Sequence, residues 1–320
     1  MKSNFSKEII LINILRDNIC GHIFECIDYY LILKKLNYQV GIYLAYNNLS
    51  KNSFKNLILD KYNLGEKELE DILKDTLIED IQTFLKRKLI YFNKNQRVIF
   101  TDAEDYCRII NDLNTVLVAE NIIALRCGYA SEHFEKLYKN KNICSNLTIL
   151  QDFRIYKNPL KNIKTYDHKK RIYFKKFKKL NKINKNCGFL YLSTECRSID
   201  EEYLKNIVTK LNFLDKIYIS VEKNKKYPPL PKVHYLHPPI KNLHELFDTF
   251  IYVPLERKFD CSPRIIAECY FYNKKIIYMD IDENYGDKGL YWRDYDCRHN
   301  FNDLILTEND LLIKKVTKRE

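Results

Sequence analysis

The first strands of this sequence are marked by continuous apolar runs rather than by alternating ones. Residues 8–15 form an Ile/Leu run that only Asn13 interrupts, and residues 38–45 form a second run. Between them, Gly21 precedes residues 23–36, whose apolar side chains recur with helical spacing. Strands that are apolar throughout are typical of parallel sheets buried on both faces. The order therefore predicts the opening of a doubly wound α/β domain.

The rest of the chain continues this alternation in two halves. In the first half we expect a helical, mixed-charge excursion, followed by short strands: 57–89, then 97–101, 115–119, 122–126 and 147–150. In the second half we expect strands at 187–193, 217–221, 233–236, 249–254 and 276–279, with helices at 199–211, 243–247 and 263–273. A final helix is expected over 301–316, and no internal repeat is visible.

A length of 320 residues suggests two domains, because single cores rarely grow beyond roughly 250–300 residues. Lysine and arginine exceed aspartate and glutamate by 12 (54 against 42), which favours an anionic partner such as a nucleotide-sugar, nucleic acid or a membrane surface. The ten cysteines are scattered without a C-x2-C pair, so we expect a reducing compartment and no structural metal. The apolar run after Lys7 is too short to span a membrane, which favours a cytoplasmic protein.

The composition changes between the two halves. Residues 156–185 carry a dense run of lysines interleaved with Tyr, Phe and Ile. We interpret residues 161–186 as a basic crossover linker between domains. Three interpretations of the basic 156–185 stretch stay open: a solvated linker helix, contact with nucleic acid through charge and stacking, or peripheral contact with an anionic membrane at its inner face.

One segment of the second half carries candidate chemistry. It follows the strand at 249–254 and contains, in order, Asp260, Ser262, Pro263, Arg264 and Glu268. Proline is favoured in the first turn of a helix and serine can cap it, so a helix is expected from residue 263. The start of such a helix can hold an anion such as a diphosphate. Glu268, one turn later, would then reach a neighbouring hydroxyl group.

The spacing Asp260-x7-Glu268, with Ser262-Pro263-Arg264 between, resembles the donor-site motif of GT-B-fold, retaining nucleotide-sugar glycosyltransferases. The resemblance is specific over residues 187–290. It implies two Rossmann-like domains facing a cleft, with the first motif carboxylate on the transferred sugar and the second on the ribose. Those families normally carry Glu at the first position, where this sequence has the shorter Asp260.

The resemblance also implies a basic residue that grips the nucleotide diphosphate after the first strand of the donor half. Arg197 matches this position, and its fork of donors suits phosphate oxygens. The companion lysine of those families is not cleanly matched, because Glu202 stands at its place. Lys205 and Lys223 are the alternatives. On this basis the domains are 1–160 for the acceptor, the linker 161–186, 187–300 for the donor, and a C-terminal helix at 301–320.

Three residues of the first half are acceptor-side candidates. Gly21 and His22 follow the first strand, at a position that resembles the acceptor-side loop of GT-B enzymes. His22 is a candidate general base or phosphate donor, with simple bonding to the nearby backbone as the alternative. Asp102 also follows a strand, and the favoured interpretation is a helix N-cap, with a catalytic role second.

Together these features predict a glycosyltransferase that takes a UDP-sugar or another nucleotide-sugar as substrate and requires no metal or other cofactor. Retention, as the resemblance implies, needs no protein base, whereas inversion requires one, and His22 is then the first candidate. The acceptor is a cell-surface glycan or lipid-linked sugar, or a phage-type hydroxymethylated DNA base. The alternative function is a non-catalytic nucleic-acid- or partner-binding protein on a GT-B shell.

Overall fold

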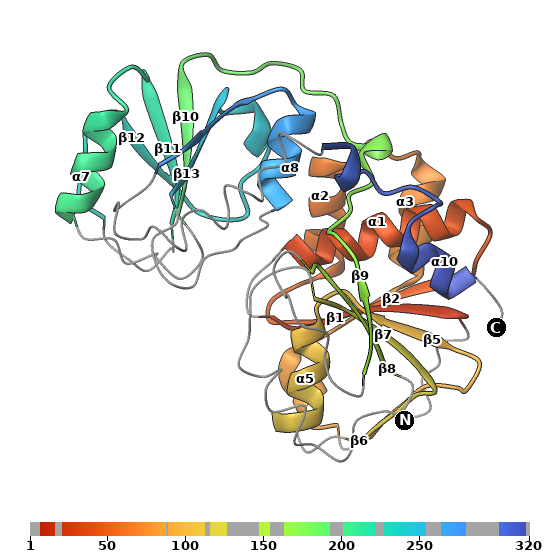
Figure 1. Cartoon of the computed structure of the whole chain (residues 1–320). Helices are drawn as coiled ribbons and strands as arrows, with labels where there is room; N and C mark the ends of the chain where they lie inside the picture. Colours follow the sequence, from red (N-terminus) through yellow and green to blue (C-terminus); the bar gives the residue numbers. More distant parts are fainter. Residues whose placement is uncertain are drawn as a thin grey trace. The chain divides into compact units, whose positions relative to one another are not determined.

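The structure is a computed structural model that describes residues 7–16, 21–87, 89–112, 116–126, 147–153, 163–192, 201–221, 227–253, 264–279 and 301–317. The chain divides into two compact units (Figure 1). The first comprises Met1–Phe177 together with Asn302–Glu320, and the second comprises Lys178–Phe301. No helix in the described ranges is long and apolar enough to cross a membrane.

The first unit is built on a seven-stranded sheet with the strand order β3-β2-β1-β5-β7-β8-β9. All neighbouring strands pair in parallel. The strands are β1 (Ile9–Arg16), β2 (Val40–Tyr46), β3 (Thr76–Glu79), β5 (Arg97–Phe100), β7 (Asn121–Arg126), β8 (Leu147–Gln151) and β9 (Lys164–Asp167). From β1 the chain builds outward to β3 and then returns to β5 on the other side, so the strand order reverses between β1 and β5.

Helices cover both faces of this sheet, as Figure 1 shows for α1 on one face and α5 on the other. They are α1 (Gly21–Lys35), α2 (Lys51–Lys61), α3 (Glu66–Lys74), α4 (Ile81–Leu85) and α5 (Ala103–Asp112). The predicted excursion over 57–89 is wrong in one respect, because it also contains β3 and part of the two-stranded sheet of β4 (Leu89–Tyr91) and β6 (Val116–Val118). Strand β3 has only four residues and ends in Glu79, so its apolar signal is weak.

The second unit contains a five-stranded parallel sheet with the order β12-β11-β10-β13-β14. Its strands are β10 (Cys187–Leu192), β11 (Lys216–Ser220), β12 (Val233–Leu236), β13 (Thr249–Val253) and β14 (Lys275–Tyr278), and its helices are α7 (Glu201–Lys210), η2 (Leu243–Glu245) and α8 (Arg264–Phe271). The helix predicted over 243–247 is a single 3-10 turn. The order reverses between β10 and β13, and the doubly wound α/β class predicted from sequence is confirmed in both units.

The predicted linker over 161–186 is wrong in its first part. Strand β9 pairs with β8 and completes the first sheet, and the segment after it buries Ile172, Tyr173, Phe174 and Phe177. Phe177 packs edge-on against Tyr62 with ring centroids 5.4 Å apart. The interleaving of lysines and aromatic residues, which suggested an exposed helix, instead lets the aromatic side chains enter the first core.

The single helix predicted over 301–316 is also wrong, because it is two elements, η5 (Phe301–Leu304) and α10 (Leu311–Thr317). Between them, Ile305 forms a bridge with Ile172, and the Leu306 amide donates to the Ile172 carbonyl at 2.8 Å. Asp310 then caps α10, its Oδ1 accepting from the Leu312 amide at 2.9 Å. The C-terminal segment therefore belongs to the first unit.

Candidate functional site

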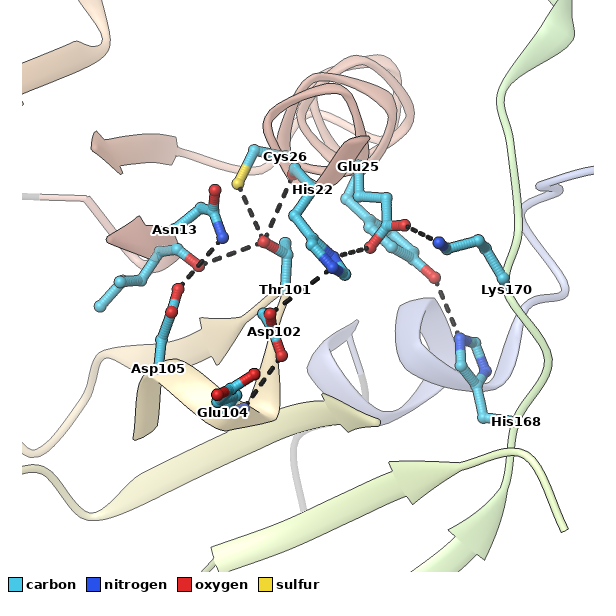
Figure 2. Close-up of polar contacts among 12 residues, drawn as sticks. Asn13, His22, Glu25, Cys26, Thr101, Asp102, Glu104, Asp105, His168 and Lys170 are labelled. Atoms are coloured by element: carbon cyan, nitrogen blue, oxygen red, sulfur yellow. Dashed lines mark hydrogen bonds and ion pairs between the residues drawn. The ribbon is translucent and has the colours of Figure 1, made fainter. Parts of the chain in front are cut away.

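The candidate site lies where the strand order of the first sheet reverses. Ligands of doubly wound sheets gather beyond the carboxyl ends of the strands at such a reversal. Here the ends of β1 and β5 meet the first turn of α1, and this brings His22 close to Thr101 and Asp102 (Figure 2). Gly21 is the first residue of α1, so both acceptor-side residues predicted at this turn lie at the reversal.

His22 is held between two carboxylates. Its Nδ1 lies 3.0 Å from Oε2 of Glu25, three residues later on the same face of α1. Its Nε2 lies 3.5 Å from Oδ2 of Asp102. An ionised carboxylate only accepts hydrogen bonds, and the Glu25 contact is the shorter of the two, so it favours a proton on Nδ1. In the neutral ring Nε2 is then the basic nitrogen, and 22% of the His22 side chain is exposed.

Glu25 is itself buried and ion-paired. Its Oε1 lies 3.1 Å from Nζ of Lys170, and the two side chains are only 3% and 8% exposed. Lys170 comes from the segment after β9, which is far from α1 in the sequence. The buried negative charge beside His22 is thus balanced by a buried positive one, which a buried carboxylate requires to stay ionised.

Asp102 has two contacts that correspond to its two predicted roles. Its Oδ1 accepts from the Glu104 amide at 3.0 Å, which is an N-cap contact at the start of α5. Its Oδ2 faces His22. The preceding residue, Thr101, joins the surrounding elements, since its Oγ1 lies 3.4 Å from the His22 carbonyl and 3.4 Å from Sγ of Cys26.

The end of β1 is fixed by a second buried carboxylate, Asp105 of α5. Its Oδ2 accepts from the Ile14 amide at 2.9 Å and from Nδ2 of Asn13 at 3.1 Å. The Tyr46 hydroxyl in turn donates to Oδ1 of Asn13. Sequence reasoning missed Asp105, although one signal pointed to it: Asn13 interrupts an otherwise apolar strand and needs a buried partner.

A buried histidine completes this edge of the sheet. Nε2 of His168 lies 3.1 Å from the hydroxyl of Tyr29 on α1. Burial, together with the charge of Arg171, lowers the pKa of His168, and the carboxylates of Asp310 and Glu25 oppose that shift. His168 is therefore held neutral next to the site.

In the second unit the structure describes part of the predicted donor site. Five predicted donor-site residues lie outside the described residues: Arg197, Lys223, Asp260, Ser262 and Pro263. Lys205 is exposed on α7, where its Nζ lies 2.6 Å from Oε1 of Glu201. The described contact of Lys205 is therefore an ion pair within its own helix.

Glu268 and Arg264 form a buried cluster with His244. Nε of Arg264 donates to Oε1 of Glu268 at 2.7 Å, and Nε2 of His244 lies 2.9 Å from Oε2. The three side chains are between 4% and 10% exposed. Both carboxylate oxygens thus meet side chains of the same unit, which the sequence did not indicate. The role of Glu268 toward a ribose stays a prediction.

The protein is an α/β protein with two doubly wound parallel sheets. Where the strand order of the first sheet reverses, between β1 and β5, His22 lies between two carboxylates. The chain matches no protein-family model and no curated protein sequence. Among solved structures it is similar to a glycosyltransferase from Rickettsia africae ESF-5, with 12% identity, a TM-score of 0.49, and coverage of 99% of this chain and 100% of that one. It is also similar to the glycotransferase of kitacinnamycin, with 10% identity, a TM-score of 0.38, and coverage of 97% and 92%.

Proposed function

We propose that this chain is a glycosyltransferase that moves a sugar from a nucleotide-sugar to an acceptor hydroxyl, with His22 as the general base. The observation that supports this most directly is the position of His22 between Glu25 and Asp102, at the strand-order reversal of the first sheet. A base within hydrogen-bond reach of a hydroxyl is what an inverting displacement requires.

In the proposed reaction, Nε2 of His22 takes the acceptor proton while the hydroxyl oxygen attacks the anomeric carbon. The bond from that carbon to the diphosphate oxygen breaks, and its electron pair leaves with the nucleoside diphosphate. The imidazolium that forms is stabilised by Glu25 at Nδ1 and by Asp102 at Nε2. General base catalysis of this kind contributes about 10²- to 10⁴-fold in rate.

The second unit is proposed to hold the donor. Its strand order reverses between β10 and β13, and the Asp260–Glu268 motif follows β13 in sequence while Arg197 follows β10. We assign the diphosphate to Arg197, helped by Lys223 or Lys205, and to the start of α8. Asp260 is assigned to the transferred sugar and Glu268 to the ribose of a UDP-sugar. One preorganised donor aimed at developing charge is worth about 3–4 kcal/mol in an oxyanion hole, and we expect a similar contribution at the leaving diphosphate.

Two stereochemical outcomes follow from different observations. The motif resemblance implies retention, in which no protein base is needed. The carboxylate contacts of His22 favour inversion, and this is the outcome that we propose. The configuration of the product's anomeric carbon, measured by NMR, separates the two.

The test begins with binding, because it needs no acceptor. Thermal unfolding is measured with UDP-, GDP-, ADP- and CMP-sugars, and a ligand at a hundred times its dissociation constant should stabilise the fold by about 2.7 kcal/mol. Arg197→Ala should remove this stabilisation. His22→Gln should keep it but lower transfer by about 10²-fold or more. Loss of donor binding in His22→Gln would argue against its role as a base.

The acceptor is then sought among lipid-linked sugars, cell-surface glycans and DNA with hydroxymethylated bases. DNA binding should weaken steeply with salt, with a slope set by the number of phosphates contacted. If no nucleotide-sugar stabilises the chain, the glycosyltransferase proposal fails. The non-catalytic binding function, in which Arg197→Ala and Asp260→Asn change nothing, would then take its place.

A further inference from the structure

Lys170 differs from its neighbours in the basic run. Its side chain is buried, whereas Lys175, five residues later, is on the surface. Its Nζ lies 3.1 Å from Oε1 of Glu25, and the other oxygen of the same carboxylate lies 3.0 Å from Nδ1 of His22 (Figure 2). A lysine, a glutamate and a histidine thus form one continuous chain that ends at the proposed base.

We propose that Lys170 is a positioning residue that determines, through Glu25, which nitrogen of His22 acts as the base. This inference rests on the proposed function, since it explains how His22 is prepared for that role. Lys170 acts only through the Glu25 carboxylate and not by contact with the acceptor or the donor.

Lys170 acts through the positive charge that it places beside Glu25. A buried carboxylate without a countercharge takes up a proton, whereas an ion-paired one stays ionised. Ionised Glu25 only accepts, and at 3.0 Å from Nδ1 it is closer to the ring than Asp102, which lies 3.5 Å from Nε2. Glu25 therefore selects the tautomer of His22 with hydrogen on Nδ1 and leaves the lone pair on Nε2. Protonated Glu25 would donate to Nδ1 instead, which would place the ring hydrogen on Nε2 and remove the base.

The backbone around Lys170 is anchored on both sides. Before it, the His168 amide donates to the Gln151 carbonyl of β8 at 2.8 Å. After it, the Ile172 amide donates to the Leu304 carbonyl of the C-terminal segment at 2.7 Å. Lys170 is therefore held between the end of the main sheet and the returning C-terminal segment, so its Nζ reaches Glu25 from a fixed position.

Histidine tautomers are measured directly by NMR on the full chain labelled with ¹⁵N-histidine, at a pH where the ring is neutral. The signals of His22 are assigned from their absence in His22→Gln. We expect Nδ1 to carry the hydrogen in the unaltered protein. Lys170→Met should shift the population to the Nε2–H tautomer, while Lys170→Arg should preserve the original one. Lys175→Met, a change in the same basic run at an exposed position, should leave the spectrum unchanged.

The inference is overturned if the unaltered protein carries the hydrogen on Nε2, a result that needs no variant. It is also overturned if folded Lys170→Met keeps the Nδ1–H tautomer. The measurement uses neither donor nor acceptor, so its outcome is independent of whether glycosyl transfer is found. Once transfer is assayed, Lys170→Met should lower kcat by about 10²-fold with KM unchanged, and Lys170→Arg should restore most of it.

Discussion

The buried ion pair on α8 gives a sharp prediction, because the second unit also contains an exposed helical pair with the same four-residue spacing. Glu268 pairs with Arg264 four residues earlier, with both side chains about 4–5% exposed. Glu201 pairs with Lys205 four residues later, with both side chains more than half exposed. We expect Glu268→Ala to destabilise the second unit far more than Glu201→Ala.

The magnitudes follow from burial. Removing Glu268 leaves the Arg264 guanidinium buried without its carboxylate, and breaking such a buried pair costs about 3–5 kcal/mol. His244 also loses its contact at 2.9 Å. An exposed helical pair contributes only about 0.3–0.5 kcal/mol, because water screens the charges and the long side chains lose freedom. The two alanine variants should therefore differ by about 3 kcal/mol in the free energy of unfolding.

Urea unfolding read by hydrogen exchange and mass spectrometry reports the two units separately. Peptides from β13 and α8 should lose protection at lower urea in Glu268→Ala, while peptides from β1 serve as the internal reference. The double variant Arg264→Met, Glu268→Leu should recover much of the loss, since neither charge is then left buried alone. Two results would refute this explanation: equal losses of stability in Glu268→Ala and Glu201→Ala, or a double variant that is less stable than Glu268→Ala.

Three further predictions concern packing and titration. A Cβ at Gly188 would lie 2.6 Å from the ends of two core side chains, so Gly188→Ala should cost about 1–3 kcal/mol in urea unfolding. Gly65→Ala, whose Cβ would meet no atom closer than 3.8 Å, should cost less, about 0.5 kcal/mol, because the only expected loss is the preference for Gly over Ala at the N-cap of α3. Burial lowers the pKa of His168 below its ordinary 6.5, so the unfolded chain binds this proton first as the pH falls. Stability in thermal unfolding should therefore drop as the pH falls through about 6.5, the pKa of the unfolded chain, and His168→Gln should lessen the drop. Burial lowers the pKa of Lys274 to about 8. NMR of ¹³C-labelled lysine should show one titration near that value that is lost in Lys274→Arg, and stability should rise between about pH 8 and about pH 10.4.

Much of the fold could be predicted because parallel sheets leave a strong local signal. The continuous apolar runs of β1, β2 and β13 and the helical spacing of α1 were recognised close to their observed bounds. The errors fell where the local signal is weak. Strand β3 is short and partly polar, and the lysines around β9 conceal aromatic side chains that enter the core.

The site was predicted only in part for a related reason. His22 and Asp102 are predicted as candidates because each follows a strand end, and strand ends of a parallel sheet meet at one edge, where the structure brings the two side chains together. Nothing in sequence indicates that Glu25 turns inward, since a glutamate in a helix is usually solvated. Lys170 lies in the predicted linker because its neighbours are basic, and the sequence gives no sign that its side chain is buried beside Glu25.

The sequence by itself determined the alternation of strands and helices, the doubly wound class and the likeness of the second half to a donor motif, because these depend on side chains close together in the chain. The tertiary structure alone decided which ionisable groups are buried together. Lys170 reaches Glu25 and His244 reaches Glu268 because segments distant in the sequence pack against α1 and α8. A buried charge is stable only beside its countercharge, and that pairing is a property of the packed chain.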